Sequence, residues 1–287
     1  MVSITVDHKQ QVSIRAGAAF FQITAMDSED YPELPDVNGK SGVTMPQSAL
    51  KAMISGTIFS VSENQARPIQ TGCLMEVTED SVTMVAVDSF RLARRTWHTE
   101  NAANHTLKFV VPAAGLKEIE RILEDSDEPV TFTLGDKHIL FSIGDALLVS
   151  RVLEGEFIDW RRVVPTNCGT VLTANVAELT SSIERVSLII SEKVKSPVRC
   201  VFGDNMADFR TANTIGSAHD TCSIAGNGGE LEIGFNSRYL LDALRVIPSE
   251  EVTLELQNGL SPIVFTPCDK KYDFAYMVLP VRLRSNS

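Results

Sequence analysis

Four segments of the chain repeat one pattern of apolar and polar positions. In each, an extended apolar run meets Pro or Asn, and four residues later a Leu opens a pattern with helical spacing, as in VTMPQSALKAM and VLTANVAELTS. Pro is tolerated in the first turn of a helix and Asn caps one, so each segment predicts a strand that turns directly into a helix. The punctuating residues are Pro46, Pro112, Asn175 and Asn236, and the leucines are Leu50, Leu116, Leu179 and Leu240, spaced by 66, 63 and 61 residues.

The stretches that follow these helices alternate apolar and polar residues. Examples are SVTMVAVDS and HILFSIGD, which are rich in β-branched residues and bounded by turns containing Asp and Gly. Such alternation is typical of strands with one buried face. The repeating unit is therefore predicted to be a strand, a helix and then about three strands, written βαβββ.

The first forty residues fit only the end of such a unit. SITVD, QVSIRAG and AFFQITAMD are three strand-like runs, followed by the Pro-rich connector DYPELPDVNGK, and a helix one repeat before Leu50 would fall outside the chain. A second connector lies near RRVVPTNCGT. We therefore expect the C-terminal remnant of a domain at 1–40 and two complete two-repeat domains at 41–167 and 168–287.

Composition places the chain among folded globular proteins. It has 287 residues, of which 44% are hydrophobic and 22% charged. No apolar run approaches the length of a bilayer span and no secretory signal is visible, so a cytoplasmic protein is expected. The five cysteines are widely spaced, which predicts isolated reduced thiols, with no metal site and no cofactor.

Catalytic motifs are not found in the sequence. It contains no P-loop, GxSxG or HExxH pattern, and its five histidines are scattered. Asp88, in VAVDSFRL, is interpreted as a turn residue rather than a general base. The chain is therefore not expected to be an enzyme.

Charge is distributed unevenly between helices and strands. The net charge is -11, yet the predicted helical stretches 46–60, 112–125, 175–196 and 236–249 sum to zero. Their cations are candidates for contacting DNA phosphates without regard to base sequence. Ordinary solvated helix faces are the alternative. These cations are Lys51, Lys117, Arg121, Arg185, Lys193, Lys195, Arg238 and Arg245.

Several strings of residues, in order along the whole chain, resemble one family. VAVDSFRLARR, RVLEGEFIDWRRVVP, IERVSLIISEK, LEIGFNSRYLLDAL and YMVLPVRL are similar to the bacterial DNA sliding clamp, the beta subunit of DNA polymerase III. The resemblance implies an α+β DNA clamp fold of repeated βαβββ units, with helices on the inner face and antiparallel sheets on the outer face. Six repeats form each protomer of a dimeric ring in the family, so this chain looks short by about one and a half repeats at its N-terminus.

The resemblance also implies the function and its partners. The family encircles double-stranded DNA as a processivity factor, and it tethers the polymerase III catalytic subunit, the clamp loader and other proteins through a peptide pocket between its second and third domains. The matching positions are Val87, Ser89, Phe90, Arg91, Leu92, Ile158, Arg162, Val163, Asn236, Tyr239, Leu260, Pro262, Met277, Leu279, Pro280, Val281 and Arg282.

Three positions depart from the family pattern. Phe90 stands where His is common, Ile158 where Pro is common and Gln70 where Leu is common. An apolar anchor should still bind, although the preferred peptide motif is expected to differ. For Val87 and Met277 a purely structural role in the core is the alternative.

Ring closure is the doubtful step. The resemblance implies that Phe21 and Ile23, on an edge strand of one protomer, face Leu188 and Ile189 of the other protomer. Without a helix to cover its sheet, residues 1–36 should expose apolar surface, and the chain should be monomeric or associate abnormally. A peptide-binding scaffold without ring closure is thus the alternative function, and a β-rich enzyme is a third with little support.

Overall fold

A computed structural model describes residues 1–30, 37, 42–100, 106–190 and 196–283. The chain divides into two compact units, Met1–Asp36 and Val37–Ser287. Each unit is described by itself.

The N-terminal unit is a three-stranded antiparallel sheet. Its strands are β1 (Val2–Val6), β2 (Gln11–Ala16) and β3 (Ala19–Thr24), in the order β1-β2-β3, followed by the 3-10 turn η1 (Ser28–Asp30). The odd-numbered residues of β3 and the even-numbered residues of β1 are apolar and exposed, Phe21 and Ile4 among them. On the other face, the Arg15 guanidinium lies 4.9 Å from the Phe20 ring centroid. The three predicted strands are confirmed, and so is the predicted exposed apolar surface within residues 1–30; residues 31–36 lie outside the described residues.

The first part of the larger unit contains two βαβββ repeats. They form two sheets, with strand order β11-β10-β9-β4 in one and β7-β6-β5-β8 in the other. The elements are β4 (Gly42–Pro46), α1 (Gln47–Ser55), η2 (Ile58–Ser60), η3 (Pro68–Thr71), β5 (Gly72–Val77), β6 (Ser81–Val87), β7 (Arg91–His98), β8 (Leu107–Pro112), α2 (Ala113–Ile122), β9 (Pro129–Leu134), β10 (His138–Ile143) and β11 (Ala146–Arg151).

The second part repeats this order with two longer strands. β13 and β14 each run through the position where the first part has a turn, and their register shifts between Phe202 and Met206. The elements are η4 (Trp160–Arg162), β12 (Thr170–Asn175), α3 (Val176–Ser187), β13 (Val198–Ala212), β14 (Ser217–Phe235), α4 (Ser237–Leu244), β15 (Glu251–Leu256), β16 (Ile263–Pro267) and β17 (Phe274–Val278).

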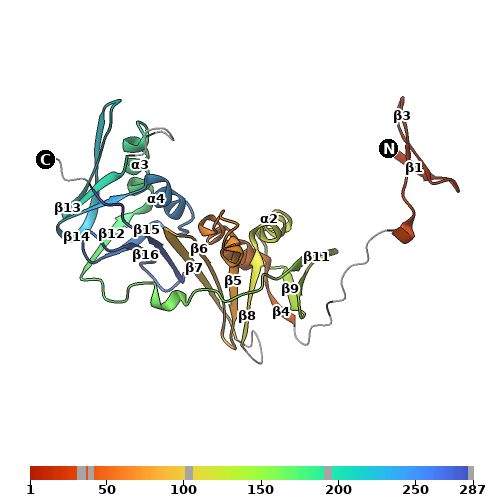
Figure 1. Cartoon of the computed structure of the whole chain (residues 1–287), viewed down its shortest axis with the longest axis horizontal. Helices are drawn as coiled ribbons and strands as arrows, with labels where there is room; N and C mark the ends of the chain where they lie inside the picture. The colour runs from red at the N-terminus through yellow and green to blue at the C-terminus, as the bar shows by residue number, and fades with distance from the viewer. Residues whose placement is uncertain (31–36, 38–41, 101–105, 191–195, 284–287) are drawn as a thin grey trace. The chain divides into compact units, whose positions relative to one another are not determined.

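One continuous sheet joins the two parts. β17 pairs antiparallel with β7, from Phe274 opposite Arg95 to Val278 opposite Arg91. The combined ten-stranded order is β13-β14-β12-β15-β16-β17-β7-β6-β5-β8. The helices α1 and α2 pack together, as do α3 and α4. In Figure 1, α2, α3 and α4 lie on one side of the strands.

The four helices begin where the sequence predicts. Each starts directly after its Pro or Asn, and the side chains of Asn175 and Asn236 accept hydrogen bonds from the backbone N–H groups of Glu178 (3.0 Å) and Arg238 (3.1 Å). The four repeat leucines are all buried in the two main clusters of core residues. The repeat and the fold class are therefore confirmed.

The five cysteines are free thiols. Burial raises the pKa of Cys73 to about 12, a shift that its hydrogen bond with Thr57 only partly opposes. Among the described helices, none has the length and apolar character to span a membrane.

Candidate partner-binding site and helical face

The joint between β7 and β17 has an apolar base. Val87, Leu92 and Met277 are buried in one cluster, against which Val163 and Leu279 pack while remaining partly exposed. The structure thus brings together five of the predicted pocket residues. The burial of Val87 and Met277 favours a core role for these two residues.

The segment between the two parts covers this cluster. Phe157 is buried in it, and the Trp160 indole donates a hydrogen bond to Glu76 (3.2 Å). Arg161 also pairs with Glu76 (2.9 Å). Burial alone would raise the pKa of Glu76, but the hydrogen bonds from Arg161 and Trp160 and the nearby positive charges lower it. The segment is therefore fastened to β5, while Ile158 and Arg162 are exposed.

An aromatic corner forms at one end of the joint. Phe90 is 53% exposed, and its ring stacks on Tyr239 with a centroid separation of 5.6 Å. The Arg91 guanidinium lies 4.6 Å from the Tyr239 centroid and pairs with Asp88 (3.1 Å) and Asp242 (2.6 Å). The backbone N–H of Leu279 donates to the Phe90 carbonyl (2.8 Å). The turn after β6, helix α4 and the C-terminal segment therefore meet here.

Other predicted pocket residues lie away from the β7–β17 cluster or have a structural role. The Asn236 side chain caps α4, and Leu260 is exposed in the segment between β15 and β16, which Pro262 also occupies. Val281 and Arg282 border a separate groove beside β13 and β14. Ser89 is exposed and Pro280 half-buried. The structure thus brings Phe90 and Leu279 together beside the apolar cluster, leaves Ile158 exposed on the covering segment and places the other residues elsewhere.

The sequence analysis missed three residues that build the site. Asp242 anchors Arg91, Phe157 fills the base and Trp160 fastens the covering segment. The apolar and aromatic residues of EFIDW could have indicated that this segment is not an exposed linker. Nothing local could have paired Asp242 with Arg91, which lies 151 positions away.

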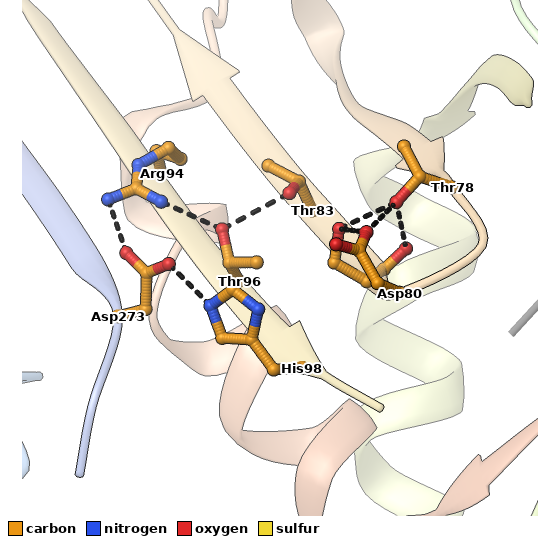
Figure 2. Close-up of polar contacts among 8 residues, drawn as sticks. Thr78, Asp80, Thr83, Arg94, Thr96, His98 and Asp273 are labelled. Carbon is orange, nitrogen blue, oxygen red and sulfur yellow. Dashed lines mark hydrogen bonds and ion pairs between the residues drawn. The ribbon is translucent and has the colours of Figure 1, made fainter. Parts of the chain in front are cut away.

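A second polar contact holds the joint at Asp273, the residue directly before β17 (Figure 2). Asp273 pairs with Arg94 (2.6 Å) and His98 (2.7 Å), and Arg94 donates to the Thr96 hydroxyl (2.8 Å). Burial alone would raise the pKa of Asp273, but the hydrogen bond and charge of Arg94, with those of His98, outweigh it and lower the pKa. The ionised carboxylate therefore stabilises the joint.

The lowered pKa of Asp273 predicts a pH dependence of stability. A carboxyl with a depressed folded pKa contributes stability above its ordinary value of 3.8, and this contribution disappears as the pH falls through the folded pKa. Asp273→Asn should lower the free energy of unfolding at neutral pH by about 1 kcal/mol, and the difference from wild type should shrink below about pH 4. Urea denaturation across this pH range measures it, and a difference that stays constant would contradict the assignment.

Most predicted DNA-facing cations already have acidic partners. Lys51 pairs with Asp125 (3.2 Å) and Arg245 with Glu184 (2.8 Å). Arg121 pairs with Glu118 (3.3 Å), Arg185 with Asp220, and Arg238 approaches Asp242 (4.0 Å). Lys117 is exposed on α2. Lys193 and Lys195 lie outside the described residues.

The four residues predicted to form the contact between protomers are divided between the N-terminal unit and the larger unit. Phe21 and Ile23 are exposed on β3, and Leu188 is exposed directly after α3. Ile189 is half-buried, and its carbonyl accepts a hydrogen bond from the Asn213 side chain (2.8 Å). Three of the four residues are thus exposed in the free chain.

Comparison with known proteins agrees with this architecture. Residues 44–159 match the family described as DNA polymerase III beta subunit, central domain, and residues 161–282 match its C-terminal domain. A protein from Eubacterium rectale assigned as a DNA polymerase III beta subunit is 32% identical, with a TM-score of 0.91, over 98% of this chain and 76% of that chain. The Pseudomonas aeruginosa subunit is 29% identical with the same TM-score and coverage.

A curated relative gives the same result. The beta sliding clamp of Staphylococcus aureus is 29% identical over 283 residues, which is 98% of this chain and 74% of that protein. The repeated βαβββ units and the joined sheet define a protein of the DNA clamp fold. The chain belongs to the DNA polymerase III beta subunit family, the bacterial sliding clamps. Members of this family serve as processivity clamps rather than as the catalytic subunit.

Proposed function

We propose that this clamp tethers the DNA polymerase III catalytic subunit, the clamp loader and other replication proteins by binding a short linear peptide at the β7–β17 joint. The supporting observation is the apolar cluster of Val87, Leu92 and Met277, against which Leu279 packs while its backbone N–H donates to the Phe90 carbonyl. In this proposal residues 1–40 form one domain segment, residues 41–167 and 168–287 form two further domains, and the chain acts in the cytoplasm.

The chemistry of the joint suits an extended peptide. Exposed aromatic and aliphatic side chains over a rigid apolar base provide the anchors that dominate peptide affinity. Phe90 is held by its stacking on Tyr239, so little conformational entropy is lost when a ligand packs against it. Arg162 can supply a polar contact at the rim, because its side chain is 87% exposed.

The helical face is proposed to lie against double-stranded DNA. Its cations occur on all four helices or directly after α4, whereas the remainder of the chain carries the net negative charge. Contacts from such a face go to phosphates and do not depend on base sequence. Encirclement would require a second protomer, with Phe21 and Ile23 facing Leu188 and Ile189.

Titration of a fluorescent clamp-binding peptide tests the tethering site. Leu279→Ala should weaken binding by about tenfold, because it removes an apolar anchor, and Arg162→Ala should weaken it by about twofold to fivefold. Leu147→Ala, which truncates an exposed leucine on β11, is the matched control and should leave the affinity unchanged. Unchanged affinity in both site variants would remove the assignment.

The second candidate is a peptide-binding scaffold that does not close on DNA. The exposed apolar residues of β1 and β3 favour it, because an exposed apolar patch of this kind can bind a partner protein in place of a second protomer. Sedimentation and retention on circular DNA separate the two functions. A stable dimer that stays on circular DNA supports the clamp, and a monomer that binds peptide but not circular DNA supports the scaffold.

A further inference from the structure

The larger unit contains two pairs of βαβββ repeats. In each pair, an ion pair of the same kind joins the two helices. Lys51 on α1 reaches Asp125, just beyond α2, at 3.2 Å, and Arg245, just beyond α4, reaches Glu184 on α3 at 2.8 Å. We call these two contacts the helix clips. Each joins residues more than sixty positions apart, and each lies where the paired helices pack together.

The helix clips are accessible to solvent and therefore individually weak. The side chains of Lys51 and Asp125 are 30% and 83% exposed, and those of Arg245 and Glu184 are 56% and 45% exposed. Exposed ion pairs of this kind contribute roughly 0 to 1 kcal/mol to stability. Since that contribution is small, their presence in both domains is poorly explained by stability alone.

The clips have a direct consequence for any phosphate that approaches the helices. A phosphate that contacts Lys51 or Arg245 must displace the carboxylate or remain close to its negative charge. A cation that is already neutralised also adds little to the counterion release that drives binding to DNA. Both effects weaken the contact and make it less dependent on salt.

We propose that Asp125 and Glu184 hold the affinity of the helical face for duplex DNA low, so that the contact is loose enough to slide. This inference rests on the proposed position of DNA against the helices. Similar pairing of Arg185 with Asp220 and of Arg121 with Glu118 extends the effect along α3 and α2. The carboxylates thus act as built-in competitors of the phosphates.

The test compares two double variants with equal changes in net charge. Asp125→Asn with Glu184→Gln removes both clip carboxylates, and Glu79→Gln with Asp269→Asn neutralises two exposed acids in turns between strands. Fluorescence anisotropy with a short linear duplex, over about 50 to 200 mM salt, gives affinity and salt slope. The clip variant should bind about fivefold to tenfold more tightly at low salt, with a slope steeper by up to about 1.8, while the turn variant should change by less than about twofold.

A third variant separates failure of this inference from failure of the proposed DNA face. Lys51→Gln with Arg245→Gln removes the clip cations and leaves Asp125 and Glu184 uncompensated, so repulsion between these carboxylates and the phosphates should weaken binding. If it does, but the clip carboxylate variant gains no more than the turn variant, the inference is overturned and the DNA face stands. If neither clip variant changes binding, the proposed DNA face itself is wrong.

Discussion

Replacing Arg91 with Ala should lower the free energy of unfolding by about 3 kcal/mol. The Arg91 side chain is only 10% exposed and pairs with Asp88 and Asp242, which are themselves largely buried. Its removal leaves two carboxylates that are largely buried, Asp88 without this cation and Asp242 with Arg238 at 4.0 Å. It also deletes the contact that links the turn after β6 to α4. Urea denaturation followed by circular dichroism would measure the loss.

A matched control separates burial from the simple loss of an ion pair. Arg162→Ala removes the same charge from a pair with Asp159 (3.1 Å), but both side chains are exposed. Its cost should stay below about 1 kcal/mol, the usual value for exposed pairs. Equal losses in the two variants would show that Arg91 does not act as a buried tether.

The sequence predicted the repeat because its signals are local. Each helix needs a residue that can start it and a Leu that enters the core, and both lie within five residues of each other. Pro46 with Leu50 and Asn236 with Leu240 show the same arrangement at opposite ends of the larger unit. Four copies of one short signal therefore sufficed to predict the repeating unit, whereas the DNA clamp fold was implied by the family resemblance.

Long-range contacts could not be predicted in this way. The pairing of β7 with β17 joins residues about 180 positions apart, and no local pattern indicates which edge strand will accept a partner. The continuity of β14 was also unexpected, because Gly226 and Gly229 are typical turn residues. Both have positive φ within the strand, where they take up the register shift.

The candidate site was only partly predictable for the same reason. The resemblance supplied Phe90, Leu279 and Ile158, and the structure brings the first two into direct backbone contact. The acidic partners of Arg91, Lys51 and Arg245 come from distant segments. They are Asp242, Asp125 and Glu184. Their charges were visible in the sequence, but their pairing depends on how the helices pack.

Gly72→Ala should destabilise the first part of the larger unit by about 3 kcal/mol, at the upper end of the usual cost of overpacking. A Cβ atom at Gly72 would lie 2.3 Å from the Val111 carbonyl oxygen and 3.0 Å from a methyl group of Leu153. Val111 belongs to β8, which pairs with β5 at this point. Its carbonyl therefore cannot move away without disturbing the backbone hydrogen bonds between the two strands. The strand that leads directly into α2 would have to shift.

Gly216→Ala is the matched control for this prediction. An added Cβ at Gly216 meets no atom within 4 Å, and its backbone is not in the left-handed region. The same substitution there should change stability by less than about 0.5 kcal/mol, or raise it slightly by restricting the unfolded chain. Because both variants add one methyl group, a large loss at Gly72 with none at Gly216 would trace the cost to the close approach of β8. Similar values for the two would mean that β5 and β8 are not packed as closely as the structure indicates.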